Sequence, residues 1–187
     1  MIRIVKLEKS HDSKQFDCTQ EWIVEDNDKA DAADMNEFLR RRALDQAKRG
    51  VSMTFVALET DGEQPNRAVA YYSTCVGHLK SDDLTKVVSP NMTIPVIHLL
   101  RLAVDKRYQN RKLGKRLLAY FFSRAVVVAE ETGIYAVVLE PLNDHVRGFY
   151  ERFGFKSLPD DPGRMYISIR DVRAWLQARA PELLNYT

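Results

Sequence analysis

The chain has 187 residues, of which 45% are hydrophobic and 29% are charged, and its formal net charge is +2. This length and composition predict one globular domain over residues 1–187, with a core of ordinary size, and argue against a second domain. The net charge is too small to indicate nucleic-acid binding by itself, so that function has to rest on local clusters of basic residues.

Cysteine usage and hydropathy indicate the cellular compartment in which the protein is found. Cys18 and Cys75 lie far apart and match no metal-ligand spacing, which indicates reduced thiols and no metal site, with a disulfide between them as the alternative. The longest apolar runs, such as Ala125–Ala129, are far shorter than the roughly 20 residues that cross a bilayer. The N-terminus carries charges where a signal peptide is apolar. We therefore expect a soluble cytoplasmic protein with no membrane partner.

The first elements along the chain are a strand, a loop and a helix. Alternating apolar residues over 2–7 predict the strand, and the polar stretch over 10–29, anchored by Phe16 and Trp22, predicts the loop. An apolar stripe at helical spacing then predicts a helix over 32–49, which Gly50 ends.

A hairpin follows this helix. Residues 52–59 and 67–79 read as two strands joined by a turn at 61–65, which is typical of an antiparallel pair. A polar connection with two prolines, over 80–95, then leads to the centre of the chain.

The centre of the chain, Val96–Glu131, reads as strand, loop and helix. The apolar run Val96–Val104 predicts a buried strand, and a polar, basic loop follows it. The helix is predicted from apolar positions at helical spacing, which are Leu113, Leu117, Phe121, Ala125 and Val128.

The last third of the chain completes a mixed α/β fold. After Gly133, a nearly continuous apolar run over 134–139 is typical of a strand covered on both faces, so we expect it to pair in parallel with Val96–Val104 through a right-handed crossover. The remaining predicted elements are a helix over 143–152, strands over 155–158 and 165–169, and a helix over 171–179.

Charges on the central helix run against its dipole. A helix dipole favours acids at the start and bases at the end. Here the residues around the first turn are basic, namely Arg111, Lys112, Lys115 and Arg116. The last turn carries two acids, Glu130 and Glu131. A phosphate bound at the helix N-terminus would make this cluster favourable, so the loop fits a phosphorylated ligand. The alternative is a basic face that is only solvated.

A second basic cluster lies on the helix predicted over 32–49. Its outer face carries Arg40, Arg41, Lys48 and Arg49. These side chains are candidates for contact with a polyanion, and the alternative is again a solvated face.

Three segments together resemble a known family: Leu102–Asp105, Tyr108–Gly114 and Phe149–Phe155. With the order of the elements, they resemble the GCN5-related N-acetyltransferases, the GNAT family. The resemblance implies a mixed α/β fold whose central sheet is splayed between the fourth and fifth strands and flanked by helices. It also implies acetyl-CoA as the cofactor.

The family binds the coenzyme through a loop of the pattern Gln/Arg-x-x-Gly-x-Gly/Ala. Gln109 and Gly114 match the ends of this pattern, whereas Lys112 stands where the first glycine is expected. Glycine there allows a positive φ and a close approach to phosphate, so the lysine either distorts the loop or supplies its own ammonium group. The coenzyme-binding residues that the resemblance implies are Leu102, Ala103, Val104, Gln109, Asn110, Arg111, Lys112, Leu113, Gly114, Lys115 and Asn143.

Within the family, the closer resemblance is to toxins of bacterial toxin–antitoxin pairs that acetylate aminoacyl-tRNA. It rests on dispersed segments that keep the same order, namely Phe16–Cys18, Phe38–Ala43, Lys48–Ser52 with Thr54–Phe55, Ile94–Ile97, Arg101–Asp105 and Phe149–Tyr150. It implies aminoacyl-tRNA and a cognate antitoxin as partners, with the basic helix face as a candidate tRNA contact. A homodimer is left open.

The family pattern places its catalytic tyrosine at Tyr150. A phenol with a pKa near 10 stays protonated at neutral pH and can donate to the departing thiolate. The alternative for Tyr150 is an aromatic side chain packed beside Phe149 and Phe153.

An obvious general base is missing from the central strand. No carboxylate lies within Val96–Val104, which favours an acceptor with a weakly basic α-amine, as aminoacyl-tRNA presents. His98 and Glu140 are alternative bases. Two other functions remain open: acetylation of a small molecule or protein amine, and a non-catalytic domain that binds coenzyme A or a partner.

Overall fold

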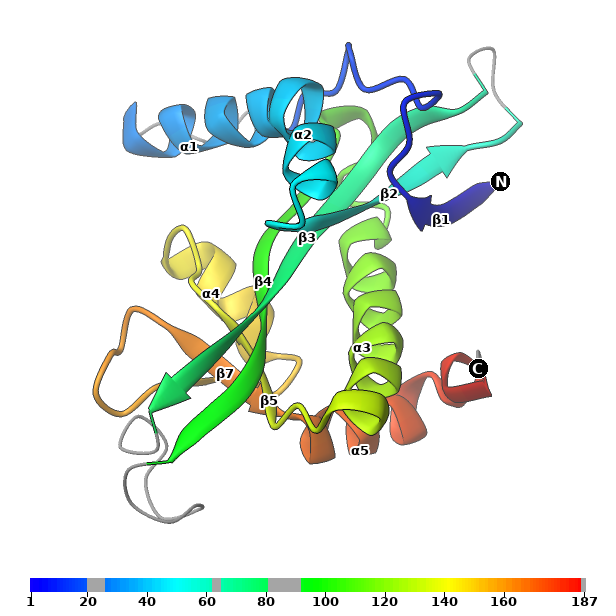
Figure 1. Cartoon of the computed structure of the whole chain (residues 1–187). Coiled ribbons are helices and arrows are strands. Elements are labelled where there is room, and N and C mark those ends of the chain that lie inside the picture. Colours follow the sequence, from blue (N-terminus) through cyan, green and yellow to red (C-terminus); the bar gives the residue numbers. More distant parts are fainter. Residues whose placement is uncertain (20–25, 62–64, 81–91, 186–187) are drawn as a thin grey trace. The chain divides into compact units, whose positions relative to one another are not determined.

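A computed structural model describes residues 1–19, 26–61, 65–80 and 92–185. Seven strands form one sheet in the order β1-β2-β3-β4-β5-β7-β6 (Figure 1). The strands are β1 (Ile2–Lys6), β2 (Met53–Glu59), β3 (Arg67–Lys80), β4 (Thr93–Val104), β5 (Ala136–Leu139), β6 (Lys156–Ser157) and β7 (Met165–Ser168). Trp22, most of the predicted turn at 61–65 and most of the connection at 80–95 lie outside the described residues.

Helices flank the sheet. They are α1 (Asp26–Glu37), the π-helical turn η1 (Phe38–Arg42), α2 (Ala43–Lys48), the 3₁₀ turn η3 (Lys106–Tyr108), α3 (Leu113–Thr132), α4 (Asp144–Glu151), α5 (Ile169–Arg179) and the 3₁₀ turn η4 (Pro181–Asn185). Among the described residues, none of these helices combines the length and the apolar composition needed to span a bilayer.

Strand pairing confirms the predicted topology. β2 pairs antiparallel with β3, and β4 pairs parallel with β5. The parallel ladder joins residues 96–98 to 136–138 and ends there, whereas β4 continues to Val104. The main chain of the last β4 residues therefore lies outside this ladder, in agreement with a sheet splayed between its fourth and fifth strands.

Two predicted boundaries differ most from the structure. The first helix begins at Asp26 instead of residue 32, because its opening turns are polar and lack the apolar period on which the prediction depended. β4 begins at Thr93 instead of residue 96 and includes Pro95. Proline lacks only the N–H donor, and the Pro95 carbonyl still accepts a hydrogen bond from the Tyr135 N–H at 2.9 Å.

The contacts of the chain divide it into two compact units. The first comprises residues 1–75 and 100–118, and the second comprises residues 76–99 and 119–187. β3, β4 and α3 each contribute residues to both. A single domain over 1–187 stays a prediction.

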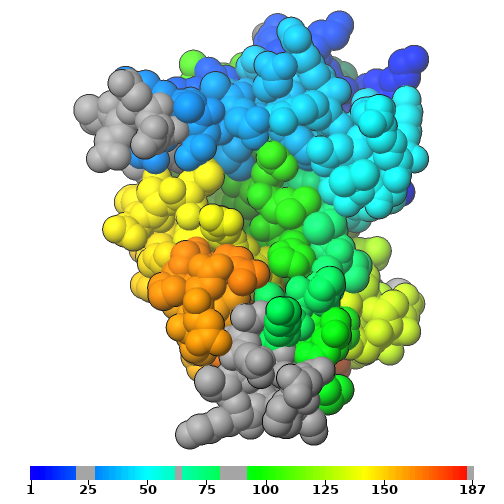
Figure 2. All heavy atoms as spheres, turned by 60° about the vertical axis from the view of Figure 1, so that its left-hand side comes forward, coloured from blue at the N-terminus to red at the C-terminus, as the bar shows by residue number. Residues whose placement is uncertain are grey.

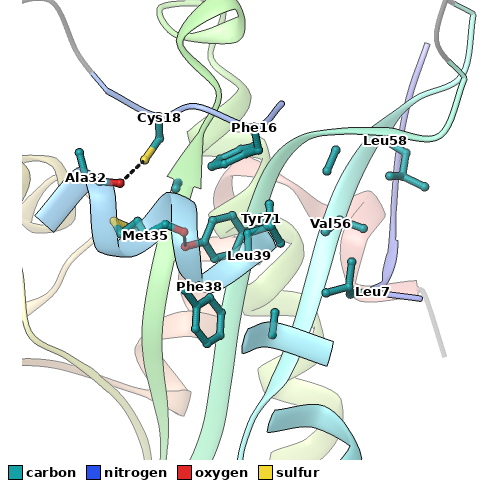
Figure 3. Packing of buried hydrophobic residues seen from close by; sticks show 13 residues of the cluster. Leu7, Phe16, Cys18, Ala32, Met35, Phe38, Leu39, Val56, Leu58 and Tyr71 are labelled. Carbon is teal, nitrogen blue, oxygen red and sulfur yellow. Dashed lines mark hydrogen bonds between the residues drawn. The ribbon is translucent and has the colours of Figure 1, made fainter. Parts of the chain in front are cut away.

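The core of the first unit lies between α1–η1 and strands β2 to β4 (Figure 3). Tyr71 is fully buried there, with its ring edge-on to Phe16 at 5.4 Å and stacked on Phe38 at 6.0 Å. Its hydroxyl donates to the carbonyl of Met35 in α1 at 2.8 Å. The helix is thereby held to the sheet by apolar contact and one buried hydrogen bond.

The second unit has two groups of buried side chains. Aliphatic residues of β3, β4 and β5 pack together with one residue that follows β6, namely Leu79, Ile94, Val96, Ala136, Val138 and Leu158. An aromatic group joins α3, α5 and the residues just after α4: Phe122 lies edge-on to Trp175 at 5.6 Å, and Phe153 lies 5.1 Å from the same indole. These contacts hold the chain where it leaves α4, the helix that carries Tyr150.

We predict that Tyr71→Phe lowers the free energy of unfolding by about 1–2 kcal/mol, because the ring packing is kept while a buried hydrogen bond to Met35 is lost. Urea denaturation measures the change. Tyr135→Phe is the control, since its hydroxyl pairs with no other described residue, and it should stay within about 0.5 kcal/mol of wild type. Equal losses in the two variants would contradict the assignment.

Candidate active site

The loop between β4 and α3 has an unusual backbone. Asn110 and Lys112 both have φ of 60°, in the left-handed region. The carbonyl of Lys112 accepts the N–H of Arg116 at 3.2 Å and so opens α3. The first N–H groups of a helix have no partner within it, and left-handed residues beside them make a concave group of donors that suits an anion.

Lys112 keeps the backbone conformation that a glycine would adopt. A φ of 60° is favourable for glycine, and a lysine that adopts it loses about 1 kcal/mol of conformational free energy. At Gly114, an added Cβ would meet only the Val104 Cγ2 atom, at 3.6 Å. A side chain at this position would therefore make only an ordinary van der Waals contact with Val104.

The basic side chains around the loop fall into two groups. Lys106 pairs with Asp17 at 2.8 Å, Arg107 pairs with Asp105 at 2.7 Å, and the Arg111 guanidinium lies over the ring of Tyr108 at 5.4 Å. The second group is exposed and, among the described residues, has no carboxylate partner; it consists of Lys112, Lys115 and Arg116. These three cations can meet a bound phosphate.

Gln109 has a supporting role in the loop. Its side-chain amide donates to the carbonyl of Val104 at 3.0 Å and to that of Cys18 at 3.2 Å. Gln109 therefore ties the loop to the end of β4 and to the segment before α1, and its side-chain nitrogen is already engaged within the protein.

Sequence reasoning missed the group of polar residues beneath this loop. Asp105 is fully buried, caps η3 and accepts hydrogen bonds from Arg107 and from the N–H of Asp17. Burial raises the pKa of the Asp105 carboxyl. Burial alone would also raise the pKa of Asp17, but hydrogen bonds from Lys106 and Thr19 outweigh it and lower that pKa. In the sequence, the one signal for this group was that Asp105 ends the segment Leu102–Asp105, which resembles the family.

The last residues of β4 carry the predicted main-chain contacts to the coenzyme. Ala103 is buried in the core of the first unit, whereas Leu102 and Val104 are partly buried. The Val104 carbonyl already accepts from Gln109. The structure thus brings Leu102–Val104, Gln109–Lys112 and the start of α3 together within the first unit.

Tyr150 and Asn143 belong to the second unit. The Asn143 side chain accepts the N–H of Val146 at 3.0 Å and caps α4, so it fixes the start of the helix that carries Tyr150. Tyr150 is 6% exposed and lies edge-on to Phe149 at 5.2 Å and to Phe155 at 5.5 Å. Burial raises the pKa of the phenol, which keeps it protonated at neutral pH.

The two alternative bases differ in their surroundings. Burial, together with the charges of Arg164 and His78, lowers the pKa of His98, so its imidazole is neutral at pH 7. A Cβ added at Gly77 would lie 2.6 Å from the His98 Nε2 atom, which shows how closely the ring covers that glycine. His98 therefore packs against the backbone of β3, while Glu140 is exposed just after β5.

The predicted polyanion contacts lie on the outer side of η1 and α2, and the surface of these elements appears in Figure 2. Arg40 donates to the Phe16 carbonyl. Arg41 pairs with Glu37 at 3.7 Å and Arg49 with Asp45 at 3.0 Å, each one helical turn away. Lys48 is exposed. All four side chains are at the surface, and Arg40 also anchors the helix to the segment before it.

The described residues contain no group of three or more His, Cys, Asp or Glu side chains arranged to hold a metal ion. Both cysteines are free thiols. Burial raises the pKa of the Cys18 thiol to about 12, so it is unreactive at neutral pH, in keeping with its place in the core.

Comparison with known proteins identifies related chains. A family model described as an acetyltransferase (GNAT) domain matches residues 52–157. A protein of Mycobacterium tuberculosis strain H37Rv named "tRNA-acetylating toxin" is 37% identical over 142 residues, which is 75% of this chain and 82% of that protein.

Solved structures share the fold. AtaT complexed with acetyl-methionyl-tRNAfMet superposes with a TM-score of 0.78 at 20% identity, covering 93% of this chain and 98% of that one. A tyrosine-to-phenylalanine variant of AtaT, bound to the C-terminus of the antitoxin AtaR and to acetyl-CoA, gives a TM-score of 0.73 at 20% identity, covering 92% and 96%.

We predict that Lys112→Gly stabilises the protein by about 1 kcal/mol and binds coenzyme A as well as or better than wild type, because glycine relieves the left-handed backbone. Denaturation and calorimetric titration with coenzyme A measure the two effects. Lys112→Ala is the matched control, since it removes the ammonium group but keeps the strain. If both variants lose affinity to the same large extent, the ammonium group is itself a ligand.

Proposed function

We propose a function from one established premise: the chain belongs to the GNAT family of acetyltransferases. The enzyme transfers the acetyl group of acetyl-CoA to the α-amino group of an aminoacyl-tRNA. A blocked amino group cannot be extended by the ribosome, so the protein acts as a toxin that inhibits translation.

The observation that carries this proposal is the 37% identity to the mycobacterial tRNA-acetylating toxin over three quarters of the chain. Two structures of AtaT with the same fold support it, one with an acetylated methionyl-tRNA and one with acetyl-CoA and an antitoxin segment. By the same analogy, we expect the partners to be acetyl-CoA, aminoacyl-tRNA and a cognate antitoxin, in the cytoplasm where charged tRNA is found.

The loop fits acetyl-CoA, which supplies an acetyl group activated as a thioester. We assign its pyrophosphate to the main-chain N–H groups from Lys112 to the start of α3 and to the ammonium group of Lys115. We assign its pantetheine arm to main-chain groups of Leu102–Val104, beyond the end of the parallel ladder. Asn143 contributes by fixing the start of α4.

Tyr150 is the proposed proton donor. As the amine nitrogen bonds to the acetyl carbon, the carbon–sulfur bond breaks and the sulfur needs a proton. The Tyr150 phenol holds one, because burial keeps it protonated. The proton that the amine loses leaves to solvent, from which the phenol is restored.

The acceptor amine needs no strong base from the protein. β4 contains no Asp or Glu, and His98 is packed over Gly77. An α-amine with a pKa near 7.7 is about one-sixth neutral at pH 7, whereas a lysine amine near 10.4 is almost wholly charged. This difference favours aminoacyl-tRNA over a protein lysine as acceptor.

We predict that radiolabelled acetyl-CoA transfers its label to charged tRNA and not to uncharged tRNA. Tyr150→Phe should slow the transfer by about a hundredfold to ten-thousandfold, because the proton donor is lost, while coenzyme A binding is kept. The control is Tyr166→Phe in β7, which should react as wild type does. Label on uncharged tRNA, or an unimpaired Tyr150→Phe enzyme, would contradict the proposal. Label on small amines alone would favour a small-molecule acetyltransferase. Absence of any transfer would favour a binding domain without catalytic activity.

The basic side chains of η1 and α2 are the proposed tRNA contacts. We predict that Arg41→Ala with Lys48→Ala weakens tRNA binding and reduces the slope of log affinity against log salt by about 0.7 to 0.9 per lost phosphate contact. Filter binding at several salt concentrations measures both quantities. Lys156→Ala, the control, removes an exposed charge on β6 and should change neither the affinity nor the salt slope. If the double variant binds tRNA as the Lys156→Ala protein does, the surface of η1 and α2 is not a tRNA contact.

A further inference from the structure

We propose that Asp105 is a positioning residue for acetyl-CoA, which fixes the phosphate-binding loop without touching the coenzyme. The proposal rests on the proposed function only in requiring that the protein binds coenzyme A. It does not depend on which acceptor is acetylated.

Asp105 stands where the strand becomes the loop and is 0% exposed. Its main-chain N–H donates to the carbonyl of Val69 at 2.9 Å, which holds it to β3. One carboxylate oxygen accepts the N–H of Arg107 at 3.1 Å and its Nε at 2.8 Å, and the other accepts the Arg107 guanidinium at 2.7 Å. The carboxylate therefore folds η3 around itself, directly before the loop.

The same carboxylate also holds a segment that lies far away in the sequence. It accepts the N–H of Asp17 at 3.2 Å, and the Asp17 carbonyl in turn accepts the N–H of Lys106 at 2.7 Å. Asn36 of α1 completes the group: its side chain donates to the Asp17 carboxylate at 3.1 Å and accepts the Cys18 N–H at 2.8 Å.

Gln109 connects this group to the loop itself. Its side chain donates to the carbonyls of Cys18 and Val104, so it spans the fixed segment and the strand end. The next three residues include the two left-handed positions, Asn110 and Lys112. Left-handed backbone conformations at such residues persist only where the surrounding structure imposes them, and here the group centred on Asp105 does so.

A buried group cannot contact a coenzyme bound at the surface of the loop. Asp105 can act only by keeping the loop N–H groups oriented toward the phosphates before binding. This lowers the conformational entropy that the loop loses when the coenzyme binds. Loss of Asp105 should therefore weaken coenzyme affinity and leave the chemical step unchanged once the coenzyme is bound.

The test is calorimetric titration of the full-length Asp105→Asn protein with coenzyme A. Asparagine keeps the shape of the side chain but loses its charge and one acceptor. We expect Kd to rise by about tenfold to a hundredfold with a stoichiometry near that of wild type. In acetyl transfer, KM for acetyl-CoA should rise while kcat at saturating acetyl-CoA is kept.

Asp34→Asn is the matched control. Asp34 also pairs with arginines in the first unit, accepting from Arg42 and, at 3.1 Å, from Arg101. Among the described residues, neither of these ion pairs involves Asp17, Asp105 or Arg107. This variant should bind coenzyme A as wild type does. Gln109→Ala is the second variant, because it breaks the link to the loop without altering the buried carboxylate, and it should raise Kd in the same way.

The outcomes separate a positioning role from a merely structural one. If Asp105 serves only stability, Asp105→Asn will show fewer binding sites per chain with an unchanged Kd, and Gln109→Ala will bind normally; that result overturns the proposal. If wild-type protein binds no coenzyme A, the proposed function fails as well. If it binds coenzyme A but acetylates no charged tRNA, the proposed acceptor alone is wrong.

Discussion

The buried carboxylate of Asp105 is the interaction on which the phosphate-binding loop depends. The carboxylate accepts hydrogen bonds from Arg107 of the 3₁₀ turn η3 and from the N–H of Asp17, while the main-chain N–H of Asp105 donates to the Val69 carbonyl in β3. Burying a carboxylate is costly unless it is fully paired, and here the bidentate Arg107 and two N–H groups provide that pairing. The surface loop that follows can then hold a backbone that isolated residues would avoid.

The basic residues at the start of α3, where the dipole opposes them, are exposed. They differ from Lys106 and Arg107 of η3, whose charges are paired with Asp17 and Asp105 before the loop begins. Only the exposed ones gain from an arriving anion. The unfavourable charge placement is thus limited to side chains that solvent screens until a phosphate binds.

The sequence left two alternatives for Tyr150, a packed aromatic side chain and a proton donor, and the proposed donor role is compatible with the packing. Tyr150 is packed between Phe149 and Phe155, as an ordinary core aromatic would be. The same burial raises the pKa of its phenol and so keeps the proton that a donor must deliver. Packing and chemistry are compatible here because the apolar surroundings that hold the ring also disfavour the phenolate.

The sequence by itself determined the order of the elements, the parallel pairing of β4 with β5, and the loop before α3, because apolar periodicity and local charge are properties of neighbouring residues. Tertiary structure decided the rest. The positive φ at Lys112 and the supporting role of Gln109 depend on partners such as Cys18, which lies far away in the sequence. The polar first turns of α1 were missed for a related reason, since a helix without an apolar stripe carries no periodic signal.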